Sequence, residues 1–94
     1  MVVTVVGIGL IGGSMAIGLR EKGLATKIIG VDADAGHQQK ALQLGLVDEI
    51  MELESAVAAS ALVILAVPVN ALLPLLKTVL NNVQGQAVMD VGST

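Results

Sequence analysis

A short run of β-branched residues near the N-terminus leads directly into closely spaced glycines. Val2–Val6 is followed by Gly7, Gly9 and Gly12, which have the G-x-G-x-x-G spacing, and a helical pattern begins directly after them. In a strand–turn–helix that holds a dinucleotide, the first glycine permits the tight turn and the second lets the main chain approach a diphosphate. The third glycine lets the helix lie against the strand, so that its N-terminus faces the phosphates.

An acidic residue ends the next strand pattern. Asp32 follows Lys27–Val31 and lies 20 residues beyond Gly12, where this fingerprint places the carboxylate that binds the adenosine ribose. Its charge repels a 2′-phosphate and no Arg follows nearby, so the sequence predicts NAD rather than NADP. The alternative is a purely structural turn beside an unrelated surface acid; the agreement of spacing, context and acid favours the nucleotide site.

Strand and helix patterns alternate along all 94 residues. Strands are expected at 2–6, 27–31, 47–51, 61–67 and 86–91, and helices at 11–22, 35–44, 53–59 and 70–80. The alternation predicts an α/β fold with a parallel sheet. With the glycine fingerprint at the first turn, it predicts a Rossmann-type doubly wound sheet with strand order 3-2-1-4-5 in a three-layer αβα arrangement. We expect residues 1–94 to be one dinucleotide-binding domain. Because no sixth strand follows, we expect the chain to be the N-terminal part of a longer protein.

The composition fits a covered parallel sheet and excludes several functions. Hydrophobic residues make up 54% of the sequence and Phe, Tyr and Trp are absent, so the core must be aliphatic. The net charge is −3 and the five Lys and Arg are scattered, which argues against nucleic acid and membranes as partners. No signal peptide is visible, so a cytoplasmic protein is expected.

The polar residues do not predict a metal site or a catalytic triad. The chain has no Cys and a single histidine, His37, which falls on a polar helix face where a solvated role is favoured. A cluster of acids is interpreted as a solvated face, namely Asp48, Glu49, Glu52 and Glu54.

Two further loops are expected at the carboxyl edge of the sheet. Pro68 follows the fourth strand and forms either a wall beside the cofactor or a simple strand-ending turn. Gly92 allows close approach near the nicotinamide, and Ser93 offers a hydroxyl there or caps a following segment. The predicted cofactor-binding residues are Gly7, Gly9, Leu10, Ile11, Gly12, Asp32, Ala66, Val67, Pro68, Gly92 and Ser93.

Taken together, these motifs resemble the prephenate dehydrogenase family. The resemblance rests on the loop at 7–14, on Gly30-Val31-Asp32, on the segment 41–48, on the turn at 65–69 and on the closing Asp90-Val91-Gly92-Ser93. It covers essentially the whole chain. The β-hydroxyacid-type dehydrogenases and pyrroline-carboxylate reductases share the glycine loop but match the other motifs less well.

The resemblance implies an enzyme of tyrosine biosynthesis that oxidatively decarboxylates prephenate to 4-hydroxyphenylpyruvate, or acts on arogenate, with NAD or NADP as hydride acceptor. It also implies a homodimer formed through a helical C-terminal domain that this chain lacks. Ser93 matches the family serine that hydrogen-bonds the catalytic histidine and the substrate hydroxyl. That histidine lies in a Gly-His-Pro segment absent from this sequence, and His37 does not match it.

We therefore expect the chain alone to bind NAD weakly and to be inactive. Two alternatives stay open at this point. One is a non-catalytic nucleotide-binding module, and the other is a dehydrogenase or reductase of a neighbouring family that acts on another small acid.

Overall fold

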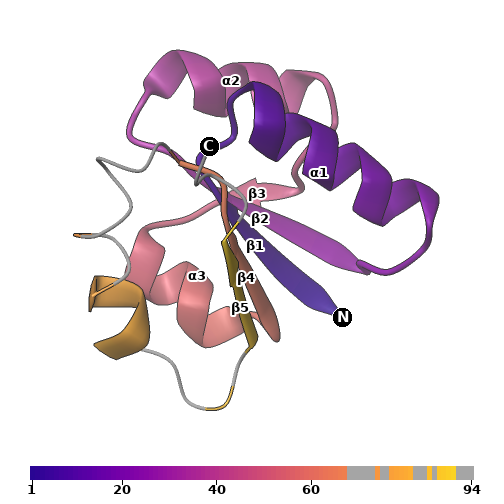
Figure 1. Ribbon diagram of the computed structural model, residues 1–94. Coiled ribbons are helices and arrows are strands. Elements are labelled where there is room, and N and C mark those ends of the chain that lie inside the picture. The colour runs from indigo at the N-terminus through magenta and orange to yellow at the C-terminus, as the bar shows by residue number, and fades with distance from the viewer. Residues whose placement is uncertain (68–73, 75–76, 82–84, 86, 91–94) are drawn as a thin grey trace.

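Five parallel strands form the centre of the molecule. The computed structural model describes residues 1–67, 74, 77–81, 85 and 87–90. The strands pair in the order β3-β2-β1-β4-β5 (Figure 1), and their bounds are β1 Val2–Val6, β2 Lys27–Val31, β3 Glu49–Ile50, β4 Leu62–Leu65 and β5 Ala87–Asp90. The predicted parallel sheet and its strand order are confirmed.

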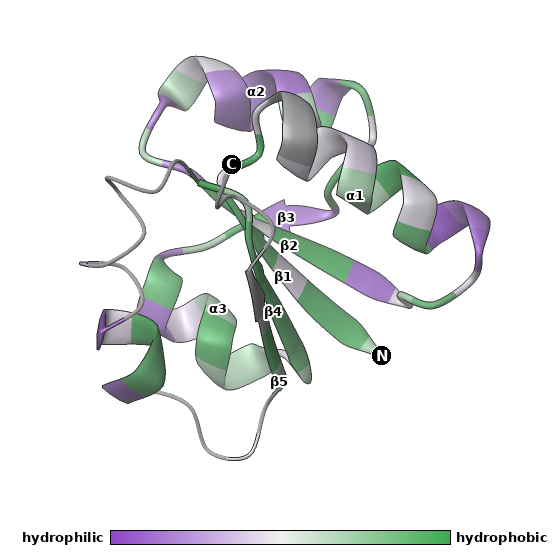
Figure 2. Ribbon diagram, in the orientation of Figure 1, coloured by the Kyte–Doolittle hydropathy of each residue, from purple (hydrophilic) through white to green (hydrophobic). Residues whose placement is uncertain are grey.

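Helices cover both faces of the sheet. α1 (Leu10–Glu21) and α2 (Ala35–Gln43) lie together on one face, while α3 (Leu53–Ala59) and the helical residues 77–81 lie on the other (Figure 1). The strands β1, β2 and β4 are mainly hydrophobic, whereas α2 carries much of the polar surface (Figure 2). A parallel sheet that is buried on both sides has this pattern, and the predicted three-layer arrangement is confirmed.

The sheet separates two aliphatic clusters. Val3 and Val5 of β1 belong to the cluster under α1 and α2, and Val6 belongs to the cluster under α3, because successive side chains of a strand point to opposite faces. Thr4 is fully buried between them, and its hydroxyl donates to the carbonyl oxygen of Ala56 at 3.1 Å. The one polar side chain of β1 therefore has a partner in α3.

β3 and β4 are shorter than the sequence indicates. β3 pairs with β2 only at Glu49 and Ile50 rather than over 47–51. The Asp48 carboxylate accepts the Ile28 N–H at 2.8 Å and so replaces the carbonyl that a longer strand would supply. β4 covers Leu62–Leu65 instead of 61–67, since the chain turns toward the glycine loop after residue 65. The first three helices begin and end within one residue of the expected positions.

Two of the four acids expected on a solvated face also form ion pairs. Asp48 lies 3.0 Å from the Arg20 guanidinium at the end of α1, and Glu49 lies 2.6 Å from the Lys27 ammonium on β2. All four side chains keep between a third and a half of their surface exposed. Asp48, Glu52 and Glu54 are exposed, so the expected solvated face is confirmed for them, whereas Glu49 is partly buried.

We expect Asp48→Asn to lower stability at neutral pH but not in acid. The Ile28 N–H, and then the Arg20 guanidinium, hold the pKa of Asp48 below its usual value against the opposing effect of burial. A carboxyl of this kind contributes stability above its unfolded pKa, and that contribution is lost as the pH falls through the folded pKa. In urea denaturation, the free energy of unfolding of the variant should therefore be lower than that of the wild type at about pH 7. This difference should vanish well below about pH 4. A difference of equal size at both pH values would contradict this account, and the exposed Glu21→Gln serves as the charge-matched control.

Candidate functional site

The chain leaves β1 through a turn that only glycine fits. Gly7 has a φ of +86°, in the left-handed region, and its N–H donates to the Val31 carbonyl at 2.7 Å. A Cβ on Gly7 would lie 2.6 Å from the carbonyl oxygen of Ala66. A Cβ on Gly12 would lie 2.0 Å from the carbonyl oxygen of Gly7, so α1 rests directly on the turn. The turn and packing roles predicted for Gly7 and Gly12 are confirmed.

Gly9 lies where this turn enters the helix and lines a cavity. It is the N-cap of α1, no side chain caps the helix, and its first turn carries no acidic residue. Among the residues that the structure describes, a Cβ on Gly9 would come within 4 Å of the His37 ring alone, at 4.0 Å. The first N–H groups of a helix have no acceptor within it and present a partial positive charge, which suits an anion. Leu10 and Ile11 open the helix; their side chains lie outside the description, and their contact with a cofactor stays a prediction.

Hydrogen bonds fasten the Asp32 carboxylate to the glycine loop. Its Oδ2 accepts the Ile8 N–H at 3.0 Å, and its Oδ1 accepts the Asp34 N–H at 2.9 Å. The side chain is only 12% exposed. Because a carboxylate oxygen can accept two hydrogen bonds, Oδ1 keeps a lone pair for a further donor such as a sugar hydroxyl. The carboxylate thus lies beside the loop, and its contact with a ribose stays a prediction.

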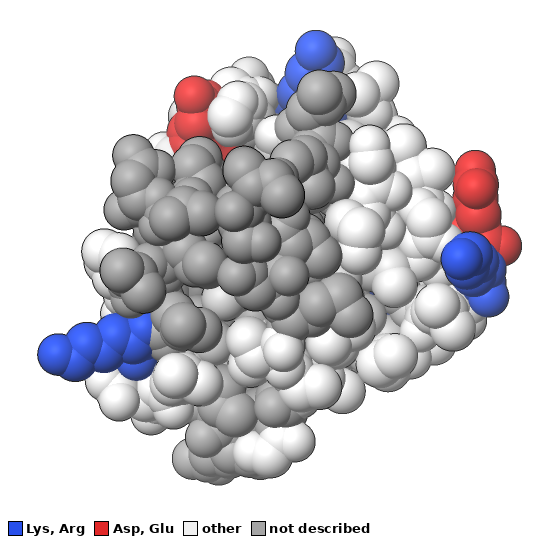
Figure 3. Space-filling model, in the orientation of Figure 1, with Lys and Arg blue, Asp and Glu red and all other residues white. Residues whose placement is uncertain are grey.

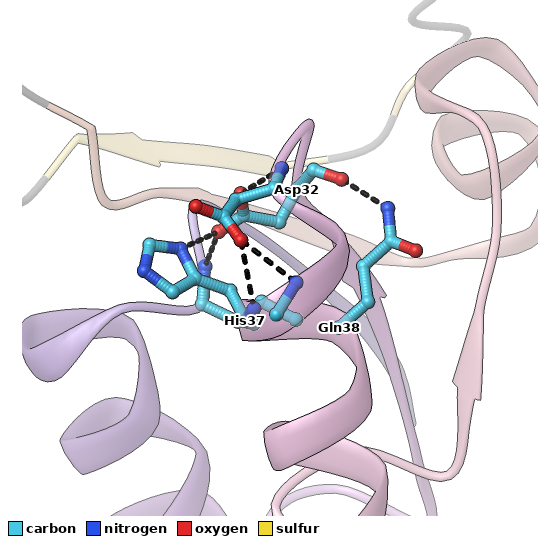
Figure 4. A network of polar contacts seen from close by, with 6 residues as sticks. Asp32, His37 and Gln38 are labelled. Atoms are coloured by element: carbon cyan, nitrogen blue, oxygen red, sulfur yellow. Dashed lines mark hydrogen bonds and ion pairs between the residues drawn. The ribbon is translucent and has the colours of Figure 1, made fainter.

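The first turn of α2 brings two side chains to Asp32. Asp34 caps this helix by accepting the N–H groups of Gly36 and His37 at 2.7 and 3.2 Å. These bonds, the one from His37 first, hold the pKa of Asp34 below its ordinary value. The Nδ1 atom of His37 lies 3.1 Å from Asp32 Oδ2, and Gln38 Nε2 donates to the Asp32 main-chain carbonyl from the other side (Figure 4).

The contact between His37 and Asp32 is absent from the sequence interpretation, which places the histidine on a solvated face. The ring is half exposed, yet it is paired with the carboxylate. A usable signal was present, because Asp is a favoured N-cap residue. An N-cap at Asp34 puts His37 in the first helical turn, directly over the strand end that carries Asp32.

A cavity of about 680 Å³ opens at the carboxyl edge of the sheet. The ends of β1, β2 and β4 form one side of it, and the connection from β3 to α3 forms the other. Its lining residues are Val6, Gly7, Gly9, Val31, Asp32, Ala33, His37, Gln38, Ile50, Met51, Glu52, Leu53, Ala66 and Val67.

Five of the predicted cofactor-binding residues line this cavity together. They are Gly7, Gly9, Asp32, Ala66 and Val67. Gly12 lies in the first turn of α1 and packs against the main chain of Gly7. Pro68, Gly92 and Ser93 lie outside the described residues, so their predicted roles beside the nicotinamide stay predictions.

Positive charge does not gather into a patch on the visible face. The described Lys and Arg side chains lie apart from one another at its margin (Figure 3). Within the described part of the chain, no group of three or more His, Asp or Glu is placed to hold a metal ion. None of the helices described is both long enough and apolar enough to cross a membrane.

Comparison with known proteins places this site in a family. A family model described as the prephenate dehydrogenase nucleotide-binding domain matches residues 15–94. The prephenate dehydrogenase of Lactococcus lactis subsp. cremoris (strain MG1363) is 32% identical over 94 residues, which cover 98% of this chain and 26% of that protein.

Solved structures of this family share the fold. The A. aeolicus prephenate dehydrogenase, crystallised in complex with hydroxyphenyl propionate and NAD+, superposes with a TM-score of 0.89 at 32% identity; the match covers 100% of this chain and 34% of that one. The Synechocystis arogenate dehydrogenase gives 0.86 at 34% identity with the same coverage. The chain spans about a quarter of the length of the curated relatives it matches. It belongs to the family of prephenate dehydrogenase nucleotide-binding domains.

Proposed function

We propose that this chain binds NAD in the cavity at the carboxyl edge of its sheet. The observation that carries the proposal is the 3.0 Å hydrogen bond from the Ile8 N–H to Asp32 Oδ2. It fixes a largely shielded carboxylate next to the N-terminus of α1, so that a sugar acceptor and an anion site line one cavity. The diphosphate would lie over Gly9, and Oδ1 of Asp32 would accept a hydroxyl of the adenosine ribose. NAD+ in the A. aeolicus relative supports the choice of cofactor.

NAD is favoured over NADP on electrostatic grounds. A 2′-phosphate would stand beside the Asp32 carboxylate, which is largely shielded from water and therefore poorly screened. No Arg follows Asp32 in the loop or in α2 to neutralise such a phosphate. NADP would have to overcome this like-charge repulsion.

The whole protein is proposed to be a prephenate dehydrogenase-like oxidoreductase. The relatives that carry this domain act in their full length, of which this chain spans about a quarter to a third. In the proposed reaction a hydride passes from prephenate or arogenate to the nicotinamide, carbon dioxide leaves and the ring becomes aromatic. Residues 1–94 supply the dinucleotide-binding domain, with Ser93 in a supporting role, and the base that takes the hydroxyl proton lies elsewhere.

The proposal extends to partners and location. We expect a homodimer formed through a further helical domain, located in the cytoplasm, whose ligands are small molecules. With five dispersed basic residues and no aromatic side chain, the chain offers little to nucleic acid or to an anionic membrane.

Calorimetric titration of the chain with NAD and NADP tests the cofactor assignment. We expect weak NAD binding and weaker NADP binding. Tighter binding of NADP would overturn the role given to Asp32, and binding of neither nucleotide would overturn the proposed site. We further expect no prephenate-dependent NADH formation by the 94 residues alone; turnover would show that the base lies within them.

A further inference from the structure

His37 lies where two cavities meet. It lines the 680 Å³ cavity and also a second one of about 380 Å³, which lies between α1 and α2. Its ring comes within 4.0 Å of the position that a Cβ of Gly9 would take, and its Nδ1 lies 3.1 Å from Asp32 Oδ2. The ring therefore stands between the proposed diphosphate site and the proposed ribose acceptor.

The His37 ring occupies a hydrogen-bond acceptor site of the Asp32 carboxylate that a ribose hydroxyl could otherwise use. Asp32 Oδ2 already receives the Ile8 N–H, so the ring fills its second lone pair. Only Oδ1 keeps a free lone pair, because its other one receives the Asp34 N–H. An incoming ribose thus meets a carboxylate–imidazole pair, and the net charge of this pair depends on the protonation of the ring.

The net charge of the Asp32–His37 pair decides whether a 2′-phosphate is repelled or tolerated. With a neutral imidazole, the Asp32–His37 pair carries one negative charge and repels the phosphate. With an imidazolium, the pair is neutral overall and the half-exposed ring offers a positive edge to the solvent side, where a 2′-phosphate would stand. We propose that His37 is a specificity-determining residue, which sets the discrimination between NAD and NADP by neutralising Asp32 when its ring is protonated. This rests on the proposed function.

Other charged groups around His37 do not duplicate its role. On its own helix, Asp34 caps the first turn beneath it and Lys40 lines the second cavity with it. From α3, Glu52 lines the larger cavity, and the glycine loop carries no charged side chain. Histidine is the side chain whose charge ordinarily changes between about pH 5 and about pH 8. Among the charged and titratable groups named here, His37 is the one whose side chain contacts the Asp32 carboxylate.

The decisive measurement is the ratio of the NADP and NAD dissociation constants at about pH 5.5 and about pH 8. His37→Gln keeps a side-chain N–H donor but is neutral at both pH values. The 2′-phosphate itself titrates near about pH 6, and this variant reports that contribution alone. We expect the wild-type discrimination against NADP to weaken on acidification by about fivefold more than that of the variant, which is the range of a partly exposed ion pair. Lys40→Gln removes a positive charge from the same helix without touching Asp32, and should behave as wild type.

Linkage gives a second readout that a merely structural role would not move. If protonation of His37 favours NADP, then NADP must favour protonation of His37. His37 is the only histidine of the 94 residues, so its ring gives a single imidazole signal in NMR. We expect its titration midpoint to lie at higher pH in the NADP complex than in the NAD complex.

The outcomes separate this proposal from the one it rests on. If NAD does not bind at all, the proposed function fails. If NAD binds but His37→Gln shows the same pH dependence of the ratio as wild type, the role of His37 fails while the binding site stands. Equal imidazole midpoints in the two complexes would likewise overturn it, whereas a higher midpoint with NADP supports it.

Discussion

Gly12→Ala is expected to destabilise the fold by about 3 kcal/mol or more, at the upper end of what overpacking a tight site costs. The new methyl would lie 2.0 Å from the Gly7 carbonyl oxygen and 3.2 Å from a methyl of Val5. The first of these is main chain, held by the left-handed turn, so it cannot move aside as a flexible side chain does. Either α1 lifts off β1 or the turn opens. Urea denaturation followed by far-ultraviolet circular dichroism measures the loss, since the chain has no aromatic residue to report it.

Gly18→Ala is the matched control on the same helix. Gly18 lies in the interior of α1, and a Cβ there would meet nothing within 4 Å. The replacement should therefore stabilise the protein by about 0.5 to 1 kcal/mol, the usual gain when alanine replaces glycine within a helix. Equal effects of the two substitutions would show that the packing of α1 on the turn has been misjudged.

Asp32→Ala is expected to weaken NAD binding by about 50-fold, the effect of losing a hydrogen bond to a charged group. The substitution removes the ribose acceptor and also releases the Ile8 and Asp34 N–H groups. Calorimetry measures the affinity, and circular dichroism checks that the variant is folded. Asp32→Asn keeps an acceptor oxygen but no charge, so it should bind NAD with a smaller loss and should no longer disfavour NADP.

Glu54→Gln provides the comparison for a lost negative charge. Glu54 is exposed in the first turn of α3 and does not line the cavity. Its replacement should change NAD affinity by less than about twofold, as expected for a screened surface charge. A loss comparable to that of Asp32→Ala would mean that general electrostatics, rather than the ribose contact, governs binding.

The sheet could be predicted from the sequence because its signals are local and periodic. Val2–Val6 is a run of β-branched residues, Lys27–Val31 has a buried centre at Ile28 and Ile29, and both strands have the expected bounds. The glycine spacing predicted the turn and the packing of α1 on it, since Gly7 and Gly12 obey steric constraints that glycine alone satisfies. The strand order followed from the glycine fingerprint at the first strand-to-helix turn, within an alternating pattern of strands and helices.

Features that depend on a distant partner could not be read from the sequence. The start of β3 is set by the Asp48 carboxylate, which replaces a main-chain acceptor for Ile28. Arg20 and Asp48 are 28 positions apart, and no periodic pattern in the sequence predicts their ion pair. The contact of His37 with Asp32 needed a side-chain direction that a helix-face pattern does not give.

The contact between Gly7 and Ala66 limits how the cavity can be changed to bind a different nucleotide. The main chain of the two loops is in such close touch there that no side chain can be inserted, so this wall of the cavity is rigid. The opposite wall is formed by Met51, Glu52 and Leu53, which directly follow a strand of only two residues. Selection for a bulkier base in place of adenine should therefore accumulate its changes in that compliant segment and spare the rigid one.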